Sequence, residues 1–256
     1  MIDPSLPIAL VTGAGRRIGR AIAIDLARHG WAIAVHHHCS GNDAAETLAA
    51  IKTEGARGAI VEADLADETQ SSGLMARAAD TLGPVSLLIN NASMFERDEI
   101  ATVSRQSWDA HMEINLRAPF LLAQAMAAAL PADGAGNVIN LLDQRVWNLT
   151  PHFISYTLSK SGLWTLTRTL ALALAPRVRV NAIGPGPTLP SARQSEEQFA
   201  RQWGSTPLAR GTTPEEICAT VQFLLAAPAV TGQMIALDGG QHLGWAPEPA
   251  AGGLEE

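Results

Sequence analysis

The sequence predicts an α/β fold, a doubly wound parallel sheet of seven strands with helices on both faces. Three observations lead to it. Short apolar runs alternate with stretches of helical spacing along the chain. The apolar runs are nearly continuous, which is typical of strands buried on both faces. No repeat and no linker interrupts residues 1–240, so we expect one domain over residues 1–245.

The first elements begin this alternation. The run IALVTG at 8–13 is apolar and closed by a glycine, which indicates a buried strand. Residues 17–30 space their apolar side chains as a helix does and end at a glycine. The run WAIAVHH at 31–37 predicts the next strand, and helix signals follow at 43–53. A strand–helix–strand–helix order at the N-terminus is the start of a parallel sheet.

The same order continues to the end of the sheet. In chain order we expect the strand GAIVEADL (58–65), a helix near 67–82, the strand VSLLINNA (85–92), a long helix at about 104–130, the strand GNVINLLD (136–143), a long helix at 153–175, the strand RVRVNAIGPG (177–186), a helix at 214–227 and the strand QMIALDGG (233–240). With the two earlier strands these make the seven that one doubly wound sheet requires.

Two segments depart from the rhythm. Residues 187–212 are rich in Pro, Ser and Gln and are long for a connection inside a compact domain. We expect this segment to be a functional lid over the site. The tail APEPAAGGLEE at 246–256 has little to bury, and we expect it to be disordered.

Composition and charge exclude several classes of protein. Of the 256 residues 47% are apolar, enough for a sizeable core, yet no apolar run reaches the length of a membrane span. The N-terminal residues lack the basic start and apolar stretch of a secretion signal. Two cysteines make no disulfide framework, which favours a reducing cytoplasm. The net charge of −7 argues against general nucleic-acid binding, but a local site can still take a small anion.

A glycine-rich turn follows the first strand. In VTGAGRRIGRAI the glycines at 13, 15 and 19 allow a tight turn and a close approach of the backbone to a pyrophosphate at a helix N-terminus. The alternative is a structural turn without a ligand. Because the turn lies between a strand and a helix, we favour dinucleotide binding by Gly13, Gly15 and Gly19.

The second strand indicates which dinucleotide binds. An acid at its end would pair with the ribose 2′-hydroxyl of NAD, but this strand ends in VHHHCSG. Arg16 in the turn and Ser40 after the strand suit a 2′-phosphate, so the sequence favours NADP. Asp64, at the end of the third strand, could bind the adenine amine or cap the following helix.

The run His36-His37-His38-Cys39 resembles a set of metal ligands only in composition. Adjacent side chains on a strand point to opposite faces, so these four cannot converge on one ion. We therefore expect no metal site.

A Tyr and a Lys with helical spacing stand near an isolated acid. Tyr156, the only tyrosine of the chain, precedes Lys160 by four residues, so the two share one helix face. Asp143 lies thirteen residues before the tyrosine, at the end of a strand. We expect all three to face one cleft at the carboxyl ends of the strands. The alternative for Asp143 is a turn residue or helix cap.

Taken together, these segments resemble the short-chain dehydrogenase/reductase family over nearly the whole chain. The matching residues, in order, are TGAGRRIG (12–19), ADL (63–65), NNAS (90–93), Asn115 in EINLRAPF, YTLSK (156–160), NAIGPGPT (181–188) and LDGG (237–240). The resemblance implies a Rossmann fold, a nicotinamide cofactor and a homotetramer. It implies that Tyr156 donates a proton, that Lys160 favours ionisation of the tyrosine and holds the nicotinamide ribose, and that Asn115 holds a water in the proton relay.

Two departures from the general family pattern point to a subgroup. Arg17 stands where the family has a glycine, and Asp143 stands where it has a catalytic serine. Pteridine reductases and bacterial dihydromonapterin reductases share both changes. Phe95 matches the aromatic that stacks a pterin against the nicotinamide, and Ser93 a residue that contacts cofactor and pterin. VHHHCS resembles the NADP segment of the subgroup, but Cys39 replaces a common basic residue.

The resemblance gives a full set of expected contacts. The cofactor residues are Gly13, Gly15, Arg16, Arg17, Ile18, Gly19, His36, Ser40, Asp64, Asn91, Ala92, Ser93, Pro185 and Gly186. The substrate residues are Ser93, Phe95, Arg17 and Leu189. A cation at a helix N-terminus is unfavourable, which suggests an anionic partner for Arg17, although it could simply be solvated. Phe95 could instead be a core residue.

An acid at position 143 suits the reduction of a ring C=N bond better than that of a ketone. Negative charge develops on a carbonyl oxygen during reduction, and an ionised aspartate would repel it. A ring nitrogen must gain a proton, and a carboxyl group can deliver that proton or pair with the resulting cation. We therefore expect an NADPH-dependent pterin or dihydropterin reductase.

Two other functions compete with this expectation. A reductase of 3-oxoacyl thioesters, sugars or other carbonyls would be expected to carry serine at 143 and glycine at 17. A cofactor-sensing binding protein would be expected to lack Tyr156, Lys160 or Asn115, which are all present. The pterin side chain and the acceptance of a fully oxidised ring stay open. His242 and Trp245 could reach a neighbouring subunit or merely pack.

Overall fold

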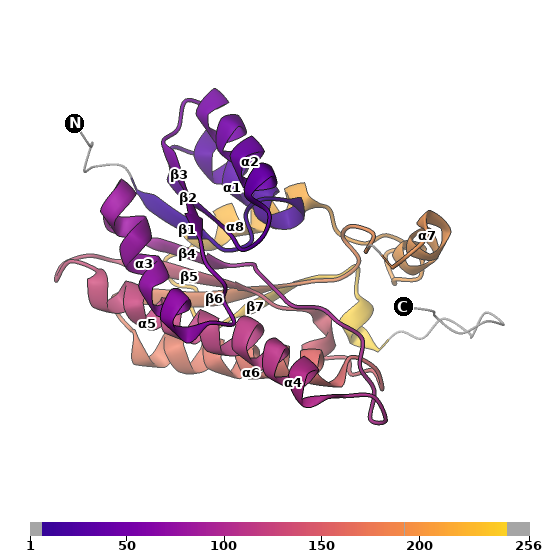
Figure 1. The fold of residues 1–256 in the computed structure, drawn as a ribbon. Coiled ribbons are helices and arrows are strands. Elements are labelled where there is room, and N and C mark those ends of the chain that lie inside the picture. Colours follow the sequence, from indigo (N-terminus) through magenta and orange to yellow (C-terminus); the bar gives the residue numbers. More distant parts are fainter. Residues whose placement is uncertain (1–6, 192, 245–256) are drawn as a thin grey trace.

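The computed structural model describes residues 7–191 and 193–244. Within them, one sheet of seven parallel strands has the order β3-β2-β1-β4-β5-β6-β7, which confirms the predicted doubly wound α/β fold (Figure 1). The strands are β1 (Ile8–Val11), β2 (Ala32–His37), β3 (Gly58–Glu62), β4 (Leu87–Asn90), β5 (Gly136–Leu141), β6 (Val178–Pro185) and β7 (Met234–Leu237). The predicted tail at 246–256 and Trp245 lie outside the described residues.

Helices cover both faces of the sheet (Figure 1). One face carries α1 (Arg17–Arg28), α2 (Gly41–Thr53) and α8 (Pro214–Ala226). The other carries α3 (Glu68–Leu82), α4 (Arg105–Met112), α5 (Ala118–Ala129) and α6 (Ile154–Ala173). No helix in the described ranges is both long and apolar enough to cross a membrane.

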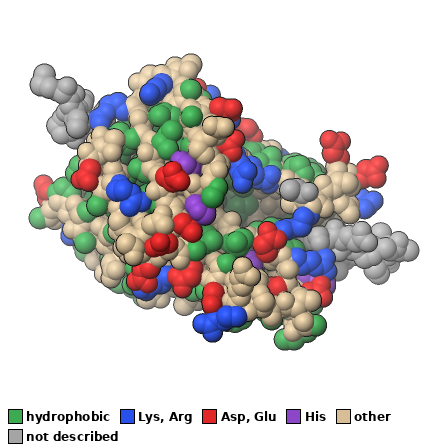
Figure 2. All heavy atoms as spheres, viewed as in Figure 1, with side chains coloured by type: hydrophobic (Ala, Val, Ile, Leu, Met, Phe, Trp, Pro, Cys, Tyr) green, Lys and Arg blue, Asp and Glu red, His purple; other side chains and the backbone are tan. Residues whose placement is uncertain are grey.

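One helix, α7 (Glu196–Gly204), stands apart from the sheet within the 187–212 segment (Figure 1). The sequence reading did not predict it. Ser195 and Gln198 form a capping box, in which each side chain accepts a main-chain N–H of the other residue. The polar composition of the segment concealed this S-x-x-Q signature. Between α7 and the body of the molecule the surface is hollowed, and Lys and Arg side chains lie along the rim (Figure 2).

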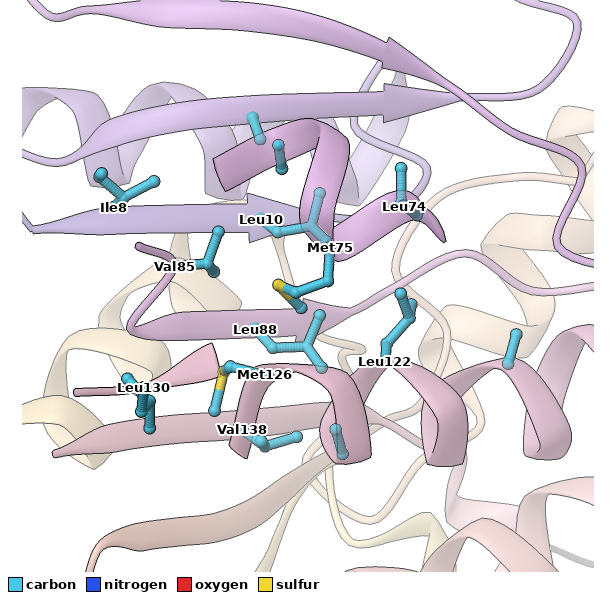
Figure 3. Close-up of a cluster of buried hydrophobic side chains, with 14 of the residues drawn as sticks. Ile8, Leu10, Leu74, Met75, Val85, Leu88, Leu122, Met126, Leu130 and Val138 are labelled. Carbon is cyan, nitrogen blue, oxygen red and sulfur yellow. The ribbon is translucent and has the colours of Figure 1, made fainter. Parts of the chain in front are cut away.

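The core explains why the strands are apolar on both faces. Along β1, Ile8 and Leu10 point to the face of α3 and α5, while Ala9 and Val11 point to the face of α1 and α8. The first face is drawn in Figure 3, where leucines and methionines of α3 and α5 pack on β1, β4 and β5. Strands buried on both sides have no polar face, so their sequences show no alternation.

The helix expected at 104–130 is interrupted. It consists of α4, a π-helical turn (Glu113–Arg117) and α5. Pro119 has no N–H to donate to the carbonyl of Asn115 four residues earlier, so an α-helical bond cannot form there. The wider turn displaces the register just where Asn115 faces the interior.

Several strands end earlier than predicted. β1 ends at Val11, β4 at Asn90 and β5 at Leu141. Thr12 therefore lies in the loop after β1, and Asp143 in the loop after β5. Thr12 and Asp143 thus follow strands at the carboxyl edge of the sheet, where parallel α/β proteins bind ligands.

Candidate active site

Two adjoining cavities, of about 550 Å³ and about 1080 Å³, open at the carboxyl edge of the sheet. The larger is lined by Gly13, Gly15, Arg16, Gly19, His36, Ser40, Asp64 and Ala92. The smaller is lined by Phe95, Asp143, Tyr156, Lys160, Pro185, Gly186 and Leu189. Arg16, Arg17, Ile18, Asn91 and Ser93 line both. The structure therefore brings together every predicted site residue except Asn115, which lies beneath the cavity wall.

The glycine turn leaves no room for side chains. A Cβ on Gly19 would lie 2.2 Å from the carbonyl oxygen of Gly13 and 2.5 Å from Nδ2 of Asn91. Gly13 has φ +63°, a conformation that L-residues with side chains rarely adopt. Nδ2 of Asn91 donates to the carbonyls of Thr12 (2.9 Å) and Gly13 (3.2 Å), which ties the loop after β4 to the turn. The start of α1 is therefore held as a compact main-chain cradle.

His36 supports this cradle from inside. Its Nδ1 accepts the main-chain N–H of Gly13 (3.1 Å), so its Nε2 carries the proton and donates to the carbonyl of Ala63 (3.1 Å). Burial lowers the pKa of His36 to about 4, which keeps the ring neutral. The structure gives this predicted cofactor residue a supporting role, because its hydrogen bonds hold the chain around the cavity.

The outer end of the larger cavity carries polar side chains. Ser40 begins α2 but makes no capping hydrogen bond with its side chain. The side chain of Arg16 is exposed and makes no hydrogen bond or ion pair with the described part of the chain. Oδ1 of Asp64 accepts the N–H of Ala66 (2.9 Å), whereas the cap of α3 is Asp67. The helix-cap alternative for Asp64 is therefore wrong.

The histidine run does not converge. His36 is buried, and the side chain of His38 is 56% exposed with Nε2 at 3.8 Å from Oδ2 of Asp64. Within the described ranges, no group of three His, Cys, Asp or Glu side chains lies close enough to hold a metal ion.

The acid, the tyrosine and the lysine meet in the smaller cavity. The Tyr156 hydroxyl donates to Oδ2 of Asp143 at 2.9 Å, across thirteen residues of chain. Oδ1 of Asp143 accepts the main-chain N–H of Arg145 (2.8 Å), so Asp143 also caps the short 3₁₀ turn Gln144–Val146. The cap and the tyrosine partner are thus two functions of one carboxylate. The sequence reading presented them as alternatives.

Lys160 lies behind the tyrosine. Its Nζ donates to the carbonyl of Leu141 (2.7 Å) and lies 5.8 Å from the centre of the Tyr156 ring. Burial lowers the pKa of Lys160 to about 8, while the charge of Asp143 opposes this shift.

Asn115 uses its side chain to fix the loop after β4. Its Oδ1 accepts the N–H of Met94 (2.8 Å) and the hydroxyl of Ser93 (3.1 Å). Its Nδ2 donates to the carbonyl of Met94 (2.9 Å) and to Oγ of Ser159 (3.0 Å). Both polar atoms of the Asn115 side chain therefore have partners. Pro119 has no N–H to donate to the main-chain carbonyl of Asn115, so this carbonyl is the group that could hold a water.

Phe95 lies on the cavity wall rather than in the core. One face of its ring stacks on Phe153 at 4.6 Å between centroids and 5° between planes. The Tyr156 ring meets it edge-on at 4.7 Å. The guanidinium of Arg193 lies 5.4 Å from the same ring. Phe95 is half-buried and is held rigidly from behind.

Arg17 contacts the 187–212 segment. Its guanidinium donates to the carbonyls of Pro190 (2.8 Å) and Leu189 (3.2 Å), so carbonyl dipoles take the place of the anionic partner expected from the sequence. Its φ of +55° lies in the left-handed region. That conformation explains why a glycine is common at this position.

Among the residues of the smaller cavity that the sequence did not predict, Arg145, Phe153 and Arg193 contact predicted ones. Arg145 contacts Asp143, Phe153 backs Phe95, and Arg193 donates to the carbonyl of Phe95 (2.7 Å) and to Glu96 (2.6 Å). Arg145 had a signal, since it follows the strand-end acid by only two residues in a turn. Phe153 and Arg193 had none, because their contacts cross 58 and 98 residues of chain.

A buried polar network anchors the loop that carries Phe95. Nε2 of His111 accepts the N–H of Glu96 (3.1 Å), and its Nδ1 lies 2.7 Å from Oγ of Ser155. The Ser155 hydroxyl donates to Asp98. Burial lowers the pKa of His111. Burial opposes the ionisation of Asp98, but its hydrogen bonds from Ser155 and Ser107 outweigh that cost and lower its pKa. This Ser–His–Asp set is buried and serves as a tether.

His242, left open by the sequence, packs within its own chain. Its Nδ1 lies 2.8 Å from Oδ2 of Asp238, and its ring meets Trp147 edge-on at 5.2 Å.

Similarity to known proteins shows which family the chain belongs to. The model described as "Enoyl-(Acyl carrier protein) reductase" matches residues 13–242. A 3-oxoacyl-[acyl-carrier-protein] reductase from Synechocystis sp. is 31% identical over 91% of this chain and 96% of its own. The chain belongs to the short-chain dehydrogenase/reductase family. This short-chain oxidoreductase keeps the Tyr–Lys pair of the family and departs from it at Asp143 and Arg17.

Solved structures extend the comparison. FolM alternative dihydrofolate reductase 1 from Brucella canis, solved with NADP, is 48% identical with a TM-score of 0.92, over 97% of this chain and 98% of its own. A blue fluorescent protein from a metagenomic library, solved with NADPH, is 32% identical with a TM-score of 0.85, over 91% of this chain and 97% of its own.

Proposed function

We propose that this short-chain oxidoreductase transfers a hydride from NADPH to a ring C=N bond of a pterin or dihydropterin. The observation that carries the proposal is the hydrogen bond from the Tyr156 hydroxyl to Asp143 in a cavity walled by Phe95. A carboxylate suits a nitrogen that must gain a proton, and an aromatic wall suits a flat heterocycle.

The residues of the larger cavity fit NADPH. The cradle around Gly13 and Gly19, which a single Cβ would fill, suits a pyrophosphate at the N-terminus of α1. The side chains of Arg16 and Ser40 have no partners among the described residues and suit a 2′-phosphate. Asp64 suits the adenine amine. The bound cofactor would supply the hydride, and residues of the chain would hold the substrate and handle the proton.

In this proposal the residues of the smaller cavity handle the proton and hold the ring. Lys160 favours an ionisable tyrosine and reaches the nicotinamide ribose, and the Asn115 carbonyl holds a water of the relay. Phe95, fixed by Phe153, forms the face against which the substrate ring stacks. Ser93 and Arg17 contact cofactor and substrate, and Leu189 covers them as part of a lid at 187–212.

The relatives support two substrate classes. The 48% identity to an alternative dihydrofolate reductase favours a pterin ring, whereas the relative named as a 3-oxoacyl reductase favours a carbonyl. We favour the pterin because Asp143 would repel the negative charge that develops on a carbonyl oxygen.

The decisive experiment follows NADPH oxidation with oxidised pterin, dihydropterin, quinonoid dihydropterin, dihydrofolate, a 3-oxoacyl thioester and a simple ketone. Tyr156→Phe is the matched control for turnover at this site. We expect reduction of at least one pterin and little of the ketone. Turnover of carbonyls with none of any pterin would reject the proposal. Titration of NADPH and NADH tests the cofactor, and tighter NADH binding would reject that part.

We also propose a homotetramer in the cytoplasm. Apolar side chains on α6 and α8 are exposed and would be covered in such an assembly: Leu158 by 46%, Leu172 by 83% and Phe223 by 54%. Light scattering that gives a monomer at micromolar concentration would contradict the tetramer. Cell fractionation would test the location.

A further inference from the structure

We propose that Arg145 is a positioning residue that holds Asp143 as a carboxylate, so that Asp143 pairs with a protonated substrate nitrogen instead of donating its own proton. This inference rests on the proposed role of Asp143 in pterin reduction. It assigns a function to a residue outside the predicted site and chooses between the two roles that a carboxyl group can take there.

The contacts of Asp143 are those of an ionised group. Its Oδ1 accepts the main-chain N–H of Arg145 at 2.8 Å. Its Oδ2 accepts from Nη1 of Arg145 at 3.2 Å and from the Tyr156 hydroxyl at 2.9 Å. Both oxygens therefore receive donors, and an ionised carboxylate is the form that only accepts hydrogen bonds.

Burial makes the pair interdependent. The side chains of Arg145 and Asp143 are only 8% and 15% exposed. A buried guanidinium without a counter-charge is strongly unfavourable. The guanidinium carbon of Arg145 also lies 5.1 Å from the Phe153 ring and 5.7 Å from the Phe95 ring, which confines it beside the carboxylate. The cation is thus fixed by the same aromatic pair that forms the substrate wall.

Arg145 is the cation in direct contact with Asp143. Of the other groups around the carboxylate in the described residues, α6 contributes Tyr156 and Lys160. In the neighbouring 3₁₀ turn at 241–243, His242 is paired with Asp238. Arg17 and Arg193 line the same cavity but bind the 187–212 segment and Glu96.

The proton balance of the reaction follows from this arrangement. Reduction of C=N to CH–NH takes one hydride from NADPH and one proton, which solvent ultimately supplies. An Asp143 held in the ionised form contributes no proton of its own. It stabilises the positive charge of a ring nitrogen that has been protonated from solvent or through Tyr156, and this charge makes the neighbouring carbon a better hydride acceptor.

The test compares Arg145→Met, which removes the charge and keeps an apolar chain against the rings, with Arg145→Lys, which keeps the charge. We expect the acid limb of the kcat/KM profile to move up by about one to three pH units in Arg145→Met and much less in Arg145→Lys. The shift should vanish when Asp143→Asn is also present. Arg193→Met, which removes another cation of the cavity, should leave the limb in place. An unmoved limb in Arg145→Met would overturn the proposal.

A second measurement needs no turnover. Carbon-13 NMR of protein labelled at the aspartate carboxyl carbons follows the ionisation of Asp143, and the signal is assigned by its loss in Asp143→Asn. Its midpoint should rise in Arg145→Met, or in Arg145→Gln if the methionine variant does not fold, and a constant midpoint would overturn the proposal. Because this readout does not depend on the substrate, failure of the inference is separate from failure of pterin reduction, which the wild-type screen detects.

Discussion

The two cavities of the cleft are built in opposite ways. Around the glycine turn the larger one is formed by main chain, where Gly13 and Gly19 leave no space for a Cβ and a neutral His36 supports the turn, and polar side chains such as Arg16 and Asp64 line its outer end. The smaller one is formed by long charged side chains and rings that come from segments far apart in sequence, such as Asp143 and Arg193. The glycine turn of the first is specified by local main-chain geometry, whereas the second is specified by charge and can be changed one group at a time.

The largest effect should come from the charged side of the cleft. Asp143→Asn keeps the shape of the side chain but removes its negative charge. Since a group that assists proton transfer to the substrate contributes about 10²–10⁴ in rate, kcat for dihydropterin should fall by about that factor. Steady-state kinetics measure turnover and NADPH titration measures cofactor binding, which should change little. Wild-type turnover in this variant would remove Asp143 from the proposed mechanism.

On the main-chain side, acid should weaken the fold through His36. Its pKa is lowered to about 4 in the folded protein, so the unfolded chain binds the proton first. The stability contributed by the neutral ring is complete above about pH 6.5 and is lost as the pH falls from there towards about 4, by about 3 kcal/mol.

Urea unfolding at several pH values measures this loss, with His36→Asn as the control. The Oδ1 of the asparagine can still accept from Gly13, but it does not titrate in this range. The variant should lose less stability than the wild type between these pH values. Identical pH dependence in both proteins would show that His36 does not carry the effect.

A single added methyl group should test how tightly the glycine turn of the larger cavity is packed. Gly19→Ala places a Cβ against Gly13 and Asn91, and overpacking of this kind costs about 1–3 kcal/mol. Calorimetric titration should therefore show NADPH binding weakened by about one to two orders of magnitude. Gly204→Ala, at the end of α7 where a Cβ meets nothing within 4 Å, is the matched control and should bind normally. Equal affinities would mean that the turn can yield.

The smallest effect is expected where a charge is added to the main-chain side. Cys39 is exposed on the wall of the larger cavity, beside Ser40. Cys39→Arg should increase the preference for NADPH over NADH about tenfold, which corresponds to about 1.4 kcal/mol from one charge-assisted contact. Cys39→Ser adds no charge and should not change the ratio of the two dissociation constants. A gain that is equal for both cofactors would exclude recognition of the 2′-phosphate.

The same contrast explains how much the sequence could predict. The order of strands and helices and the glycine turn followed from local patterns, because apolar runs and glycines act where they stand. The pairing of Asp143 with Tyr156 was also predictable, since one closely follows a strand and the other lies in the first turn of the next long helix. Phe153 behind Phe95 could not be predicted, because that stacking depends on how two loops meet. The only sequence signal for the π-helical turn at Asn115 was Pro119, and the only signal for α7 was its capping box.

The loop after β4 is tied down along its whole length, by Thr12 at its start, by Asn115 in the middle and by His111 and Asp98 beyond Phe95. A segment fixed at such short intervals sets the distance between the glycine turn and Phe95 on the cavity wall. Lengthening it by one residue would move Phe95 away from the hydride path or break an anchor. We therefore expect relatives with other substrates to differ mainly in the 187–212 segment, because its length and composition can change without changing the distance between the glycine turn and Phe95.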